Sequence, residues 1–141
     1  MKKVGLMAVC LVFLFVSSGF AKESKGLNVI VTSGDAQTQM MAMALSMMTI
    51  KKGKEVKMVL CSKAGDLAVK GMKGEIIKPL NKSPEMMLKA LIQKGATVKV
   101  CPLYLPNAAK DESVLIDGVT VAVPAEVAAS LLDDEYQNLS Y

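Results

Sequence analysis

Apolar and polar positions divide the chain into an uncharged N-terminal stretch and a longer part in which short apolar runs alternate with helical patterns. Runs rich in β-branched residues predict five strands, at 28–32, 55–61, 97–101, 119–123 and 137–141. Helical patterns lie between them at 36–51, 83–95 and 124–133, with shorter turns at 66–70 and 111–116. Because strands and helices alternate, the pattern predicts an α/β fold of three layers, with a mainly parallel five-stranded sheet between helices on both faces.

Residues 1–21 have the pattern of a cleavable secretory signal peptide. Lys2 and Lys3 give a positive start, residues 4–20 carry no charge, and Gly19-Phe20-Ala21 matches the small-x-small site that signal peptidase accepts. The alternative is an uncleaved membrane anchor, but the uncharged stretch is at the short limit for a span. We therefore expect a signal peptide at 1–21, a single domain at 22–141, and a periplasmic or secreted protein.

The composition excludes several classes of function. Beyond Ala21 the chain has 15 lysines and 13 acidic residues, a net charge of +2, and the whole sequence has no histidine. The lack of histidine excludes Ser-His-Asp and Cys-His catalytic couples and imidazole metal sites. With three tyrosines as the only aromatic residues after Ala21, the weak charge does not fit nucleic-acid binding. We expect no cofactor, no bound metal, no nucleic-acid partner, and no membrane contact once the signal is removed.

The helical pattern at 36–51 is unusual because apolar residues surround it instead of forming one stripe. Five methionines lie in it: Met40, Met41, Met43, Met47 and Met48. A helix that is apolar all round needs cover on its far side as well, and methionine suits adaptable interfaces. A thioether copper site would need histidine or cysteine among the methionines, so we favour packing or contact with another subunit.

Two cysteines, Cys61 and Cys101, come at the ends of predicted strands, where open α/β sheets place their ligands. Because side chains alternate along a strand, neighbouring strands in similar register would bring both thiols to the same side of the sheet. Three interpretations stay open: packed hydrophobic side chains, a structural disulfide in an oxidising compartment, or a reactive thiol at Cys101. Lys63 and Lys110 follow the same two strands and are candidates for lowering the pKa of a thiol there.

A succession of short motifs runs through 27–141. The first strand is followed by Thr-Ser-Gly-Asp, the second by Ala-Gly-Asp-Leu-Ala-Val-Lys-Gly, and later come Val-Lys-Val-Cys-Pro, Leu-Ile-Asp-Gly-Val-Thr-Val and a terminal Asn-Leu-Ser-Tyr. In this order they resemble the DsrE/DsrF-like family. The resemblance implies a five-stranded parallel sheet assembled as trimers or hexamers, and a cysteine after the third strand, matched by Cys101, that carries sulfur as a persulfide. Some relatives have Cys-x-x-Cys there, whereas this chain has Cys-Pro-Leu-Tyr, ending at Tyr104.

We therefore expect an exported DsrE-like protein that acts in sulfur (persulfide) transfer or thiol-redox chemistry through Cys101, with Cys61 as a resolving partner. Such a protein would be a sulfur carrier rather than a classical turnover enzyme, and its donor and acceptor would be other proteins. It would form a homo-oligomer, a trimer or hexamer, through the methionine-rich first helix. The alternative is a non-catalytic oligomeric binding or structural protein whose cysteines are packed or disulfide-bonded.

Overall fold

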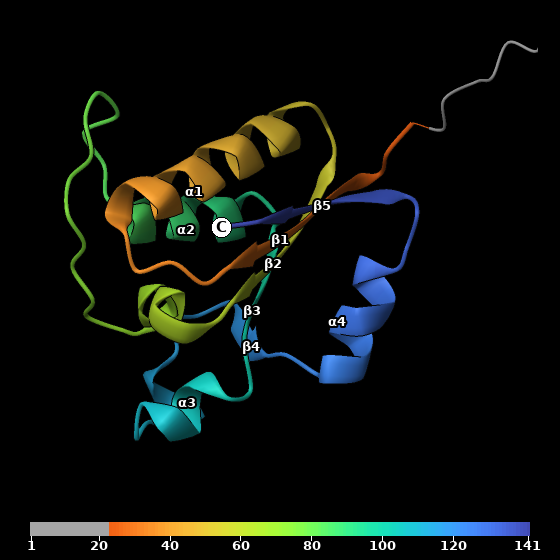
Figure 1. The fold of residues 1–141 in the computed structure, drawn as a ribbon. Helices are drawn as coiled ribbons and strands as arrows, with labels where there is room; N and C mark the ends of the chain where they lie inside the picture. The colour runs from red at the N-terminus through yellow and green to blue at the C-terminus, as the bar shows by residue number, and fades with distance from the viewer. Residues whose placement is uncertain (1–22) are drawn as a thin grey trace, which may run out of the picture.

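A computed structural model describes residues 23–141, so the expected signal peptide at 1–21 lies outside the described residues. The described part forms one five-stranded sheet of order β4-β3-β2-β1-β5, in which every neighbouring pair is parallel (Figure 1). The strands are β1 (Gly26–Val31), β2 (Glu55–Leu60), β3 (Thr97–Val100), β4 (Val119–Val121) and β5 (Tyr136–Ser140). The helices are α1 (Ala36–Lys51), α2 (Pro84–Gln93), α3 (Tyr104–Asn107) and α4 (Pro124–Leu131), with 3-10 turns η1 (Ser62–Ala68) and η2 (Glu112–Val114). The predicted α/β fold is confirmed.

Helices lie on both faces of the sheet, as the alternating pattern predicted. The α1 and α2 helices pack together on one face, and α4 lies on the other (Figure 1). The side chains of the central strands beneath α1 and α2 are at most 2% exposed: Val29, Val31, Val56, Met58, Leu60, Val98 and Val100. On the face toward α4, Ile30, Val59 and Lys99 are only half-buried. The hydrophobic core therefore lies between the sheet and the α1–α2 layer.

The methionine-rich helix α1 has one covered and one uncovered side. Its start is capped by Asp35, whose carboxylate accepts a hydrogen bond from the Thr38 backbone N–H at 2.8 Å. Met40, Met43 and Met47 are buried, whereas an outer stripe is between 41% and 53% exposed: Met41, Leu45 and Met48. No part of the chain from 23 to 141 covers this stripe, and none of the helices in that range has the length and hydrophobicity that a membrane span requires.

Short helices and one long irregular segment gather where the strands end. The η1 turn begins directly after β2, earlier than the predicted turn at 66–70, and α3 occupies a position where the sequence predicted only a loop. Between η1 and α2 runs an exposed segment, residues 69–82, which we call the strap. Ser83 and Pro84 begin α2 as predicted, with proline in the first turn, where its missing N–H costs nothing. The η1 turn and the α3 helix therefore lie just beyond the ends of β2 and β3.

Candidate functional site

The two cysteines are lateral neighbours at the carboxyl ends of adjacent strands. Leu60 of β2 is paired with Val100 of β3, so Cys61 and Cys101 are the next residues along the same register. The Cys101 backbone N–H donates to the Leu60 carbonyl at 2.8 Å, which extends the ladder to the thiols. Both cysteines are free and half-buried. The expected neighbouring arrangement is therefore present, and both side chains leave the sheet opposite the buried Leu60 and Val100.

The environment of the pair keeps one thiol protonated. Burial, a hydrogen bond to Cys101 and the charge of Cys101 raise the pKa of the Cys61 thiol to about 12. The Cys61 thiol therefore keeps its proton to a higher pH than an ordinary cysteine does. The form of cysteine that attacks other sulfur atoms is the thiolate, so Cys61 is the less reactive thiol at neutral pH.

A wide hollow opens in front of the two thiols. Its volume is about 790 Å³, and it is lined by the segments that follow β2 and β3: Cys61, Ser62, Lys63, Asp66, Cys101, Leu103, Tyr104, Asn107, Ala108 and Lys110. Lys63 and Lys110, which follow these strands in the sequence, therefore line the same hollow as both cysteines. Leu103 stands at the rim and is 70% exposed. The hollow is open enough for a protein segment or small molecule to reach the sulfur atoms.

Tyr104 fixes the two segments that carry the cysteines. Its hydroxyl donates to the Asp66 carboxylate at 2.5 Å, and its ring lies directly against the backbone of Gly65. The Lys110 ammonium lies 5.9 Å from the centre of the ring. Burial and the hydrogen bond to Asp66 raise the pKa of Tyr104, so the phenol stays protonated. Tyr104 therefore joins the segment after β3 to the segment after β2.

Other features of the described residues add no second chemical centre. Between 23 and 141 no group of three or more histidine, cysteine, aspartate or glutamate side chains is placed to hold a metal ion. A smaller hollow of about 240 Å³ lies between α4 and the sheet. Its two lysines, Lys57 and Lys99, each already have a partner. Lys99 pairs with Glu126 at 2.7 Å, and Lys57 lies 3.7 Å above the Tyr136 ring. The thiol pair remains the candidate site.

Comparison with known proteins gives matches among solved structures. No family model matches the chain, and no curated protein matches it. The crystal structure of the YchN protein from E. coli is 22% identical, with a TM-score of 0.64 over 82% of this chain and 99% of that one. A protein of unknown function from Methanobacterium thermoautotrophicum, MTH1491, is 10% identical, with a TM-score of 0.61 over 84% of this chain and all of the other.

These neighbours support a DsrE-like fold. At 22% and 10% identity the likeness shows the fold alone and assigns no role to any residue. The DsrE-like fold brings together all four polar residues that the sequence singled out, namely Cys61, Cys101, Lys63 and Lys110. It also adds a pair that sequence reasoning missed, Tyr104 with Asp66. The only signal for that pair was that both residues closely follow the two cysteine-bearing strands.

Proposed function

We propose that the protein carries sulfur, or exchanges thiols and disulfides, through Cys101, with Cys61 as its partner thiol. The observation that carries the proposal is the lateral pairing of the two free thiols inside an open hollow that also contains two lysines. Open α/β sheets place their chemistry at the carboxyl ends of strands, which is where this pair lies. The DsrE-like fold is compatible with a sulfur-relay role.

The chemistry is an exchange of sulfur–sulfur bonds. The Cys101 thiolate attacks the outer sulfur of a donor persulfide; a new S–S bond forms on Cys101, the donor S–S bond breaks, and the donor leaves as a thiolate. An acceptor thiolate then takes the outer sulfur in the same way and returns Cys101 to its thiolate. Cys61 is the neighbouring free thiol beside Cys101 throughout both steps.

The same pair supports the thiol-redox form of the proposal. With a disulfide as co-reactant, Cys101 forms a mixed disulfide and releases a substrate thiolate. Cys61 gives its proton to that thiolate and then attacks the Cys101 sulfur. The products are a Cys61–Cys101 disulfide and two substrate thiols, so the protein loses the two electrons that the substrate gains. Sulfur transfer predominates when the molecule that enters the hollow is a persulfide, and thiol–disulfide exchange predominates when it is a disulfide.

Mass spectrometry of the protein, purified without reductant, tests the proposal. We expect a fraction of Cys101 to carry one added sulfur atom or a mixed disulfide, and the Cys101→Ser variant to lose this adduct. The matched Cys61→Ser variant should retain it. A quantitative Cys61–Cys101 bridge that resists mild reduction would instead support structural cysteines, as would an unchanged phenotype for Cys101→Ser. Either result favours the alternative, a non-catalytic oligomeric protein.

Export of the protein is part of the proposal. The support is the positive start, uncharged stretch and small-x-small site within 1–21. We expect the protein in the periplasm or the medium, with Lys22 as its first residue. N-terminal sequencing of the fractionated protein tests this, and full-length protein in the cytoplasm would contradict it.

A homo-oligomer is also part of the proposal. The support is the exposed stripe on α1, since Met41, Leu45 and Met48 leave a contiguous apolar strip on a helix that is otherwise packed. Light scattering should give a mass that is a multiple of the protomer, and Met41→Ser with Met48→Ser should lower it. A monomeric wild-type protein would contradict this part alone.

A further inference from the structure

The strap, residues 69–82, exposes large apolar side chains. None of its residues is buried, and Ile76 and Leu80 are 53% and 47% exposed. Met86, in the first turn of α2 just after the strap, is 46% exposed. Three exposed large apolar residues thus lie within eleven positions of the sequence. Exposed apolar residues that are grouped in this way indicate an interaction surface.

The same segment concentrates positive charge. The strap holds one acidic residue, Glu75, against four lysines: Lys70, Lys73, Lys78 and Lys82. Within 23–141 no ion pair engages Lys73, Lys78 or Lys82. The strap alone thus carries a net charge of +3, whereas the rest of the described chain is net negative. Positive charge and apolar surface therefore coincide on one segment of the molecule.

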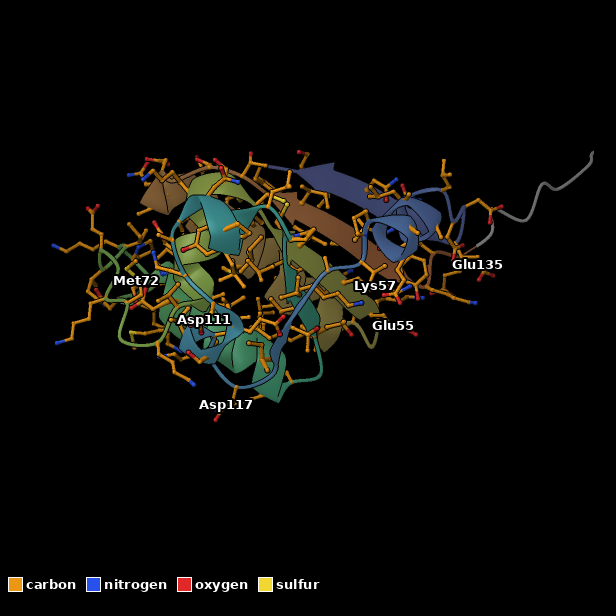
Figure 2. All side chains as sticks on the ribbon, turned by 90° about the horizontal axis from the view of Figure 1, so that it is seen from below. Glu55, Lys57, Met72, Asp111, Asp117 and Glu135 are labelled. Carbon is orange, nitrogen blue, oxygen red and sulfur yellow. The ribbon has the colours of Figure 1, made fainter. Side chains whose placement is uncertain are left out.

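The shape of the strap is a projecting turn. The Ile77 backbone N–H donates to the Lys82 carbonyl at 2.9 Å, which closes a turn with Leu80 near its tip. Both ends of the strap are fixed to the rest of the fold. The Lys70 backbone N–H donates to the Val114 carbonyl, and the residues after Lys82 are buried at the start of α2. The strap passes outside the helices at one end of the molecule, where it is drawn in green (Figure 1). Met72, a strap residue, is labelled at this end in Figure 2.

We propose that the strap binds the surface of an anionic lipid bilayer. Protein–protein interfaces are depleted in lysine, whereas lysines that flank exposed apolar side chains on a convex segment suit a layer of anionic headgroups. Ile76, Leu80 and Met86 enter the headgroup layer, and Lys73, Lys78 and Lys82 contact lipid phosphates. This is a surface contact and no span, and it departs from the expectation, drawn from the sequence, of no membrane contact once the signal is removed.

The contact goes beyond the thiol function and gives it an orientation. The η1 turn lines the thiol hollow and leads directly into the strap, so both lie where the strands end. A protein bound through the strap would hold the hollow close to the bilayer surface. Proteins or small molecules that are confined to the membrane surface would then meet the thiols at raised local concentration.

Sedimentation with lipid vesicles tests the proposal. The processed protein, with its N-terminus verified by intact mass, is mixed with vesicles of phosphatidylcholine alone or with added phosphatidylglycerol. We expect binding only to the anionic vesicles, with weakening as salt rises. The triple variant Lys73→Glu, Lys78→Glu and Lys82→Glu should bind at least about a hundredfold more weakly. Ile76→Ser with Leu80→Ser should weaken binding as well, since apolar burial is lost.

Matched controls separate this proposal from its rivals. Lys51→Glu, Lys52→Glu and Lys94→Glu change the same charge at exposed helix ends, and this variant should bind more tightly than the strap variant by at least about tenfold. Cys101→Ser should bind as the wild type does, so failure of the thiol proposal does not affect this one. No binding to anionic vesicles at low salt, or equal loss in both lysine variants, would overturn it. A strap variant with an altered oligomeric mass would do the same, because the strap would then contact a second copy.

Discussion

The two edges of the sheet use polar side chains in different ways. At the amino edge, where the strands begin, charged groups pair with each other: Lys54 with Glu23 at 2.7 Å, and Lys25 with Glu135. At the carboxyl edge the hollow holds two free thiols and two lysines, Lys63 and Lys110, that form no ion pair within 23–141. Figure 2 shows Glu135 and Glu55 at one end of the molecule and Met72 at the other.

Each edge has one tyrosine that donates to a carboxylate. Tyr136, at the start of β5, donates to Glu55 at 2.6 Å, and Tyr104 donates to Asp66 at 2.5 Å. The first bond ties together the starts of two strands, whereas the second ties together the segments that carry the thiols. The comparison indicates that polar groups at the amino edge hold the fold, while those at the carboxyl edge also determine how the cysteines are presented.

The largest effect is expected from two glycine substitutions, one at each edge. A Cβ at Gly26 would collide with the backbone of Glu55, and a Cβ at Gly65 would collide with the Tyr104 ring. Backbone yields less than a side chain, so Gly26→Ala should lower the free energy of unfolding by at least about 3 kcal/mol and Gly65→Ala by about 1–3 kcal/mol. Urea unfolding measures both.

The same pair separates stability from thiol chemistry. Under native conditions only Gly65→Ala should change the rate at which iodoacetamide modifies Cys101, because it displaces the Tyr104 segment. An equal change in the Gly26→Ala protein would show that the two edges are not independent.

A smaller effect is expected when each tyrosine loses its hydroxyl. Tyr136→Phe and Tyr104→Phe each remove one hydrogen bond to a carboxylate and should each lower the free energy of unfolding by about 1–3 kcal/mol. Only Tyr104→Phe should alter the midpoint at which Cys61 and Cys101 form a disulfide in a dithiol–disulfide redox buffer, because it frees the two segments that hold them. If both variants shift this midpoint equally, Tyr104 has a structural role alone.

The sequence predicted the sheet well because its strands are short β-branched runs between helical patterns and turn residues. The parallel order placed Cys61 beside Cys101, and alternation along the strands predicted their common side. The sequence did not predict the bond between Tyr104 and Asp66, because Asp66 lies 38 positions earlier and no local pattern joins them. The α3 helix was missed because four residues that contain Pro106 give no helical period.

The next prediction concerns pH and the protonated thiol. The folded pKa of Cys61, about 12, lies above its ordinary value of 9.0, so the unfolded chain loses this proton first as the pH rises. The stabilising contribution is therefore complete below pH 9 and declines between pH 9 and 12. The difference in free energy of unfolding between wild type and Cys61→Ser should fall over this window. Subtraction removes the titration of lysines and tyrosines, and a constant difference would contradict the shift.

The smallest effect on stability is expected for lysines at the two edges. Lys54→Gln removes an exposed ion pair with Glu23, and Lys63→Gln removes a cation from the hollow, and neither should measurably shift the urea midpoint. They should differ in reactivity. A cation near a thiolate lowers the energy of the charged form, so Lys63→Gln should slow alkylation of Cys101 several-fold at low salt, and the difference should shrink as salt rises. Equal alkylation rates in the two variants would mean that Lys63 does not act on the thiols.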